Sequence, residues 1–154
     1  MKVKIISPRW PEHSIWRQMH FRFPTLNLAT LAALTPEEYD VAIEDENVED
    51  INFDDDTDIA AITAMTPLAP RAYQIADKFR ERGKKVVLGG FHATWMPDEA
   101  IRHADAVVQG EAEGVWPKVL EDLKNNRQQR FYKNSSLPKV SDMIIPRRDL
   151  LALK

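Results

Sequence analysis

Short apolar runs alternate with helix-like segments along most of this 154-residue chain, and that alternation limits the fold more than any other feature. The runs are rich in valine, isoleucine and alanine and are too short to be helices, so each is predicted to be a strand. The run at residues 59–63 is apolar at almost every position, which is typical of a strand covered on both faces. The predicted strands are Val3–Ser7, Tyr39–Ile43, Ile59–Thr63, Lys85–Leu88 and Ala106–Gln109.

Helices are predicted between these strands, because apolar residues recur there at helical spacing and proline or glycine marks the ends. The predicted helices are Pro24–Leu34, Leu68–Arg82, Pro97–His103 and Glu113–Leu123. Alternation of this kind is typical of a three-layer α/β domain built on a parallel sheet. We therefore predict a flavodoxin-like (Rossmann-like) fold with a five-stranded parallel sheet in the order 2-1-3-4-5.

This sheet type places ligands beyond the carboxyl ends of its strands. The segments of interest are therefore residues 8–23, 64–67, 89–97 and 110–114. The usual phosphate-binding signals are absent there, since residues 7–11 read Ser-Pro-Arg-Trp-Pro where a dinucleotide site needs Gly-x-Gly-x-x-Gly. No P-loop pattern occurs either, and the third strand does not end in the aspartate of a phosphoacceptor domain.

The same segments instead carry glycines, small hydroxyls and aromatic side chains. Gly89 and Gly90 remove side chains where the fourth strand ends, which leaves room for a flat group against the backbone. A site of this composition suits a large planar ligand with a few polar groups. The hydroxyls and rings come from Thr63, Thr66, Thr94, Trp10, Trp16, Phe91 and Trp95.

Composition excludes several classes of function. The absence of cysteine excludes disulfides, thiolate zinc sites and iron–sulfur ligation within this chain. A net charge of -3 is not the electrostatic footprint of a nucleic-acid-binding protein. No apolar run approaches the roughly 20 residues of a membrane helix, and the first residues do not resemble a signal peptide, so we expect a cytoplasmic protein without a membrane partner. The acidic stretch Glu44–Asp58 is expected to be a solvated loop.

The character of the chain changes after residue 124. Lys124–Arg148 holds seven basic residues and one acidic residue, and Pro138 and Pro146 interrupt it. We predict a domain of residues 1–124, followed by an extended linker of residues 125–154 that has little to pack on, apart from the anchors Phe131 and Tyr132. The apolar residues at 150–153 indicate a connection to a further domain.

Several of these segments together resemble the cobalamin-binding domain found N-terminal to radical SAM domains. Residues 89–97 (Gly-Gly-Phe-His-Ala-Thr-Trp-Met-Pro) resemble that family's Gly-Gly-x-His-x-Thr-x-x-Pro segment, and residues 110–113 resemble its Gly-Glu-x-Glu. Residues 24–34 are similar to its first helix, and residues 146–150 are similar to the segment that leads into the radical SAM barrel. Members include magnesium-protoporphyrin ester cyclases and cobalamin-dependent methyltransferases.

The resemblance implies a chain that binds base-off cobalamin and is catalytically inert alone. In the parent protein, cobalamin would serve methyl transfer or radical chemistry on a small molecule. The partner would be a C-terminal radical SAM domain of the same parent chain, which would hold SAM and an iron–sulfur cluster. The Asp-x-His-x-x-Gly motif that ligates cobalt in other cobalamin domains is absent, so no axial ligand is predicted. The implied cofactor contacts are Trp10, Thr63, Ala64, Met65, Thr66, Gly89, Gly90, Phe91, His92, Thr94, Gly110, Glu111 and Glu113.

Two other functions remain open: an interaction domain that has lost cobalamin, and a flavin- or nucleotide-binding protein of flavodoxin type. Several site residues also have structural alternatives. These are a buried structural histidine at His92, a tight turn at Gly89–Gly90, core-covering rings at Trp10 and Trp16, helix caps at Thr63 and Thr66, and carboxylates favouring a helix dipole at Glu111 and Glu113. For His13, an exposed loop histidine is expected rather than an axial cobalt ligand.

Overall fold

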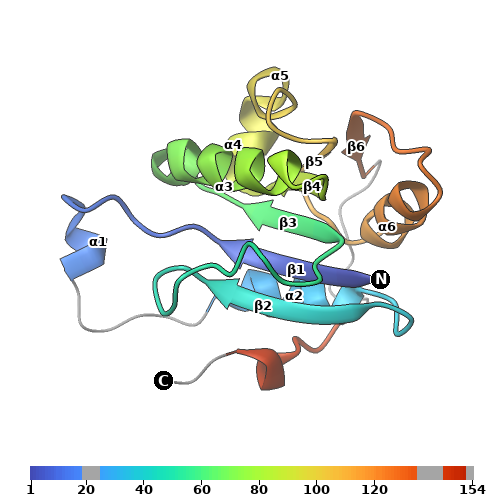
Figure 1. Ribbon diagram of the computed structural model, residues 1–154, viewed down its shortest axis with the longest axis horizontal. Coiled ribbons are helices and arrows are strands. Elements are labelled where there is room, and N and C mark those ends of the chain that lie inside the picture. Colours follow the sequence, from blue (N-terminus) through green and yellow to red (C-terminus); the bar gives the residue numbers. More distant parts are fainter. Residues whose placement is uncertain (19–24, 135–143, 152–154) are drawn as a thin grey trace.

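A computed structural model describes residues 1–18, 25–134 and 144–151, and it contains a single parallel sheet (Figure 1). The strand order is β2-β1-β3-β4-β5-β6, so the predicted order 2-1-3-4-5 is confirmed and a sixth strand is added at one edge. The strands are β1 (Lys2–Ser7), β2 (Asp40–Asp45), β3 (Ile59–Thr63), β4 (Lys85–Gly89), β5 (Ala106–Gln109) and β6 (Phe131–Lys133).

Helices cover both faces of the sheet, which confirms the three layers. On one face, α2 and α6 bury apolar side chains against the sheet, while α3, α4 and α5 do so on the other. The helices are α1 (Ile15–Gln18), α2 (Leu26–Leu34), α3 (Ala69–Glu81), α4 (Gly90–Trp95), α5 (Pro97–Ala100) and α6 (Trp116–Lys124), with short 3-10 turns η1 (Thr66–Leu68) and η3 (Arg148–Leu150). Pro24, the predicted start of the first helix, lies outside the described residues.

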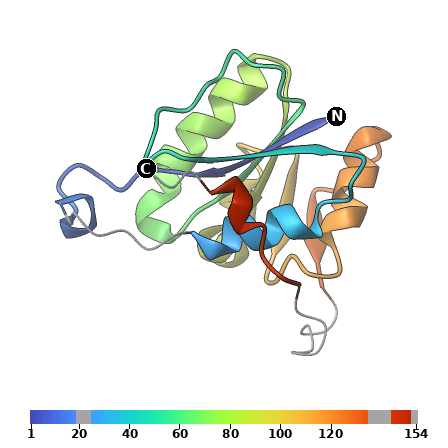
Figure 2. The ribbon, with the colours of Figure 1, turned by 90° about the horizontal axis from the view of Figure 1, so that it is seen from below.

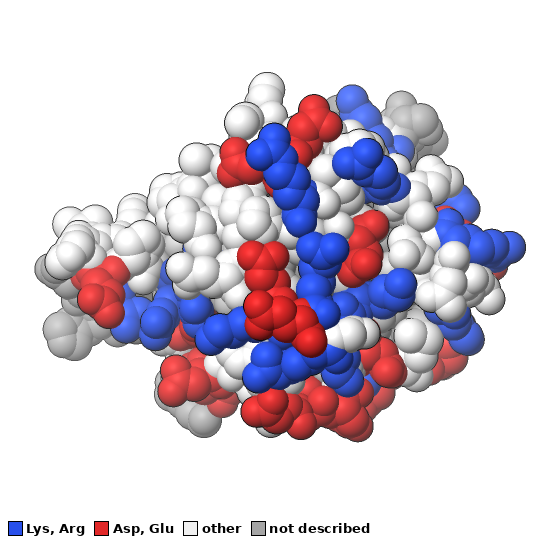
Figure 3. All heavy atoms as spheres, turned by 45° about the horizontal axis from the view of Figure 1, so that its top comes forward, with Lys and Arg blue, Asp and Glu red and all other residues white. Residues whose placement is uncertain are grey.

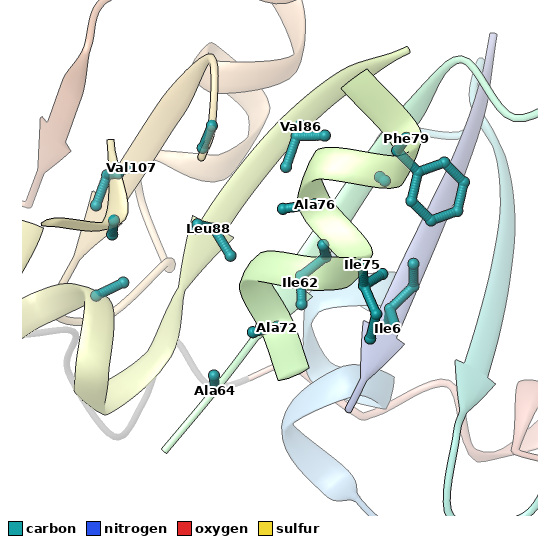
Figure 4. Close-up of a cluster of buried hydrophobic side chains, with 14 of the residues drawn as sticks. Ile6, Ile62, Ala64, Ala72, Ile75, Ala76, Phe79, Val86, Leu88 and Val107 are labelled. Carbon is teal, nitrogen blue, oxygen red and sulfur yellow. The ribbon is translucent and has the colours of Figure 1, made fainter. Parts of the chain in front are cut away.

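The central strands alternate their side chains between two cores, as the period of a strand requires. Figure 4 shows the core under α3, where Ile75, Ala76 and Phe79 of the helix lie over Ile62 and Val86 of the sheet. All five are buried. This packing fixes α3 to β3 and β4 and thereby sets the position of the loops that follow these two strands.

The sixth strand corrects the prediction that no strand follows residue 124. Tyr132 and its neighbours pair in parallel with β5, with Val108 opposite Tyr132. Tyr132 is buried, and its hydroxyl donates to the Asp122 carboxylate at 3.0 Å and accepts from the Gln129 N–H at 2.9 Å. The sheet therefore extends to Lys133, and Phe131 and Tyr132 are the anchors that their apolar character predicted.

The C-terminal segment returns to the domain and packs on α2, so the expectation that it has little to pack on is wrong. The Arg147 N–H donates to the Ala29 carbonyl at 3.0 Å, and Leu150 packs against the core beneath α2 (Figure 2). This contact accounts for the apolar residues of α2, since the helix has the sheet on one side and η3 on another. Residues 135–143 and 152–154, also part of the predicted linker, lie outside the described residues.

The acidic stretch after β2 also differs from the expected solvated loop, because it neutralises a buried lysine. Lys4 lies in β1 and is fully buried. Its ammonium contacts Glu44 Oε1 at 2.7 Å and Asp55 Oδ2 at 2.9 Å, and it donates to the Asn52 carbonyl at 2.6 Å. These three partners match the three protons of the ammonium group, which satisfies a charge that would otherwise be costly to bury.

Within the described residues, no helix is long and apolar enough to cross a membrane.

Candidate functional site: the carboxyl edge of the sheet

All strands run in the same direction, so the loops after β1, β3, β4 and β5 meet at one edge of the sheet. In Figure 1 this edge lies on the left, towards α1. Backbone hydrogen bonds join neighbouring loops here: the Ala64 N–H donates to the Gly89 carbonyl at 3.2 Å, and the Ala64 carbonyl accepts from the His92 N–H at 3.1 Å. The edge is the place where this fold class binds ligands.

Large apolar side chains are exposed at this edge. Phe91 is 71% exposed and Trp95 is 77% exposed. Met96, which follows Trp95, and Met65, in the loop after β3, are also exposed. Trp16, in the short helix α1 after β1, is also exposed. On the face shown in Figure 3, Lys, Arg, Asp and Glu gather over the middle and right, whereas the upper left, towards this edge, is largely without them. Exposed apolar surface of this kind marks a place where a partner or ligand binds.

The helix α4 presents two of these side chains and was not predicted. Its first residue directly follows β4, and the helix runs only from Gly90 to Trp95. Phe91 and Trp95 are four residues apart, so they share one face of the helix. His92 and Ala93 are buried on the opposite side. The sequence predicts a loop over residues 89–97, because a Gly-Gly pair normally indicates a turn.

Gly90 has a structural role, because its backbone conformation and its neighbours both require a glycine. Its φ is +87°, a conformation that residues with a side chain rarely adopt. A Cβ at this position would lie 2.6 Å from Thr63 Oγ1 and 3.1 Å from both the N and O atoms of Ala64. The space beside Gly90 is thus filled by the end of β3. Gly110 also has a positive φ, +74°, but a Cβ there would meet no atom within 4 Å.

His92 is held inside the protein, as in the structural alternative. It is 7% exposed, and its Nε2 lies 2.9 Å from the Tyr73 hydroxyl and 3.4 Å from Glu99 Oε1. Its Nδ1 lies 3.4 Å from Thr66 Oγ1. Burial raises the pKa of Tyr73, and its hydrogen bond to Glu99 raises it further, so the phenol keeps its proton. These contacts occupy both ring nitrogens.

The threonines at this edge connect the loops to one another. Thr94 Oγ1 donates to the Gly90 carbonyl at 2.9 Å and accepts from the Gly110 N–H at 2.9 Å, which links α4 to the end of β5. Thr63 ends β3 and is half-buried, and Thr66 is exposed. Neither caps a helix through its side chain, since η1 and α3 have no side-chain cap hydrogen bond. The capping alternative is therefore wrong for both.

Two residues after β2 fix the loop after β1, and sequence reasoning did not identify them. Asn47 accepts from the Trp10 N–H at 3.0 Å and donates to the Pro8 carbonyl at 3.3 Å. Glu46 accepts from the Arg9 N–H at 3.1 Å. Together they continue the pairing of β1 and β2 beyond the strand ends. Trp10, half-buried against the core under α3, is thereby set with its ring 5.9 Å from that of Trp16.

Glu46 is a buried carboxylate with two cationic neighbours. Arg71 of α3 donates to both carboxylate oxygens through Nε at 3.0 Å, and its Nη2 also contacts Oε1. Burial raises the pKa of Glu46, but the hydrogen bonds from Arg71 and the Arg9 N–H outweigh it, so the pKa is lowered overall. The ion pair therefore ties the loop after β1 to α3 at ordinary pH.

The remaining predicted residues lie at the same edge with fewer contacts. Glu111 is exposed and Glu113 is half-buried just after β5. The helix α6 begins at Trp116, so both carboxylates precede it as predicted, and neither lies in its first turn. His13, in the loop after β1, is exposed. Residues 8–18, 63–66, 89–96 and 110–113 thus lie together at one edge of the sheet, where several rings and apolar side chains are exposed.

Comparison with known proteins identifies the family. The family model described as "B12 binding domain" matches residues 14–120. Bacteriochlorophyllide d C-8(2)-methyltransferase of Chlorobaculum tepidum is 46% identical over 114 residues, which are 73% of this chain and 25% of the relative. Bacteriochlorophyllide d C-12(1)-methyltransferase of the same organism is 37% identical over 123 residues, 79% of this chain and 27% of the relative.

The chain therefore spans about a quarter of the length of these curated relatives. A solved structure, the N-terminal domain of the hypothetical protein TM0182 of Thermotoga maritima, is 20% identical with a TM-score of 0.48 and covers 79% of this chain and 99% of that one. The family match includes α1, β3, α4 and β5, the elements that build the edge described above. On these grounds the chain belongs to the B12-binding domain family.

Proposed function

We propose that this chain binds cobalamin at the carboxyl edge of its sheet and presents it to a further domain of a larger methyltransferase. The observation that carries the proposal is the set of exposed apolar side chains at that edge, in a chain of the B12-binding family. A corrin ring is broad and mostly apolar on its faces, and Phe91, Trp95 and Met65 offer matching surface. The loops after β3, β4 and β5 are proposed to bind the nucleotide tail of cobalamin.

We propose that cobalamin binds base-off and without a histidine of this chain on cobalt. Among the described residues of the edge, His92 has both ring nitrogens engaged, which leaves His13 as the exposed imidazole. His13 lies in no Asp-x-His-x-x-Gly motif. Of the residues predicted to touch the cofactor, the exposed Met65, Phe91 and Gly110 are the strongest candidates, because the described part of the chain leaves them uncovered.

The reaction of the parent protein is proposed from its relatives. Both relatives are named as methyltransferases of bacteriochlorophyllide d, and we propose a cytoplasmic radical SAM methyltransferase of the same general kind. When bound, cobalamin supplies a carrier for the methyl group, while the radical SAM domain would supply SAM and its iron–sulfur cluster. The residues of this chain bind and orient the cofactor. We further propose that the connector to that domain begins after Lys133 rather than at residue 125, because β6 belongs to the sheet.

Equilibrium dialysis of the purified chain against hydroxocobalamin tests the proposal. Trp95→Ala should weaken binding about tenfold, because a large ring would lose its contact with the corrin. Ile145→Ala is the matched control, since Ile145 is 87% exposed and lies in the C-terminal segment. Neither substitution removes a buried side chain, so both variants should melt like the wild type. Absence of binding by the wild type would favour the interaction domain that has lost cobalamin.

A further inference from the structure

We infer that His92 and Tyr73 position the helix α4 for cofactor binding, and that His92 does so without touching the cofactor. The inference rests on the proposed function and adds to it the residues that keep the binding edge in shape. Its starting point is that α4 spans only six residues, from Gly90 to Trp95, and is too short to be stable alone. Contacts with other elements must therefore hold it.

The contacts converge on one side chain. His92 faces into the domain, where its Nε2 lies near both the Tyr73 hydroxyl of α3 and the Glu99 carboxylate of α5. The contacts with Tyr73 and Thr66 are satisfied together when His92 Nε2–H donates to the Tyr73 oxygen, the Tyr73 O–H donates to Glu99, and Nδ1 accepts from the Thr66 hydroxyl. One imidazole thus joins α4 to η1, α3 and α5.

Tyr73 is itself held in place from the other side. Its ring stacks on that of His103 at 4.2 Å between centroids and 9° between planes. His103 Nδ1 in turn lies 3.0 Å from both carboxylate oxygens of Asp77, one turn further along α3. The hydroxyl that His92 contacts is therefore presented by a fixed ring, and the position of that hydroxyl sets the rotation of α4.

The rotation of α4 decides what the edge presents. Phe91 and Trp95 share the exposed face of α4, and His92 and Ala93 are its buried residues, so both rings point away from the domain only while His92 points inward. Loss of the anchor would let α4 turn or fray, and the rings would lose their common orientation. Tyr73 is a suitable position for a test, because it belongs to α3 and makes its contact from behind α4.

The test compares two tyrosine hydroxyls. Tyr73→Phe removes the hydroxyl behind α4, and Tyr132→Phe removes one that is also hydrogen-bonded, on the opposite face of the sheet. Both variants should show a similar small drop in Tm, because each loses comparable hydrogen bonds. In dialysis against hydroxocobalamin, Tyr73→Phe should bind about fivefold more weakly, in proportion to one lost hydrogen bond, while Tyr132→Phe should bind like the wild type.

Two further measurements separate positioning from direct contact. Amide hydrogen exchange without cofactor should be faster at Trp95 and Met96 in Tyr73→Phe than in Tyr132→Phe, because the end of α4 opens more often. His92→Gln keeps a donor towards Tyr73 and should bind cobalamin better than His92→Ala. Equal affinity and equal exchange in the two tyrosine variants would overturn the inference. If the wild type does not bind cobalamin, the proposed function fails, and the exchange measurement still decides whether Tyr73 holds α4.

Discussion

Gly90→Ala should destabilise the domain far more than the same change at another left-handed glycine. At Gly83 and Gly110, φ is +72° and +74°, and an added Cβ meets nothing within 4 Å. Alanine there adds only the strain of the left-handed conformation, about 1 kcal/mol. At Gly90 the same strain is joined by contacts of 3.1 Å with two backbone atoms of Ala64 and 2.6 Å with the Thr63 hydroxyl. Relieving such overpacking costs typically about 2 kcal/mol more.

The assay is thermal unfolding of three single variants and one double variant. At about 3 °C per kcal/mol for a domain of this size, Gly83→Ala and Gly110→Ala should lower Tm by about 3 °C and Gly90→Ala by about 9 °C. Adding Thr63→Ala to Gly90→Ala removes the closest contact and should recover part of the loss, as expected for residues that touch. An equal decrease in Tm in the three single variants would refute the assignment of Gly90 to backbone packing.

The structure makes two more predictions about stability. Burial raises the pKa of Asp55, but hydrogen bonds from Lys4 and Thr57 outweigh it and hold the pKa at about 2. The pKa is below the unfolded value, so the resulting stability, about 2 kcal/mol, is present above about pH 4 and is lost as the pH falls towards 2. In urea unfolding, the difference in unfolding free energy between wild type and Asp55→Asn should therefore shrink over that range, and a constant difference would contradict the prediction. Deleting residues 138–154 should cost about 2 kcal/mol through the lost Leu150 packing and the Arg147 hydrogen bond, whereas an unchanged Tm would mean that the segment does not hold to α2.

The order of the sheet could be predicted because it follows from a repeated pattern. Each of the first five strands is an apolar run long enough to be recognised, and the crossover rule leaves few ways to arrange them. The strand β6 could not be predicted, because only Phe131 and Tyr132 indicate it, within a basic stretch interrupted by proline. The sequence also could not reveal that Lys4 is fully buried, because its partners lie in a distant acidic stretch.

The location of the site could be predicted, but the direction of its side chains could not. The carboxyl-edge rule correctly selects the loops after β1, β3, β4 and β5. His92 and Trp95 are ring-bearing residues of one short segment, yet His92 is buried and Trp95 is exposed. The difference comes from Tyr73 and Glu99, which belong to other helices. Asn47 gave no signal at all, since its role is to bind backbone groups of a different loop.

An absorbance titration of the purified chain with hydroxocobalamin shows directly whether this domain holds base-off cobalamin. The wild type should convert the corrinoid to its base-off spectrum at a saturating ratio of one corrinoid per chain, because one site per chain is proposed. His13→Ala should give the same spectrum, since no histidine of this chain is proposed to bind cobalt. A wild-type titration without spectral change would contradict base-off binding. A base-off spectrum that disappears in His13→Ala would contradict the proposal by identifying His13 as a cobalt ligand.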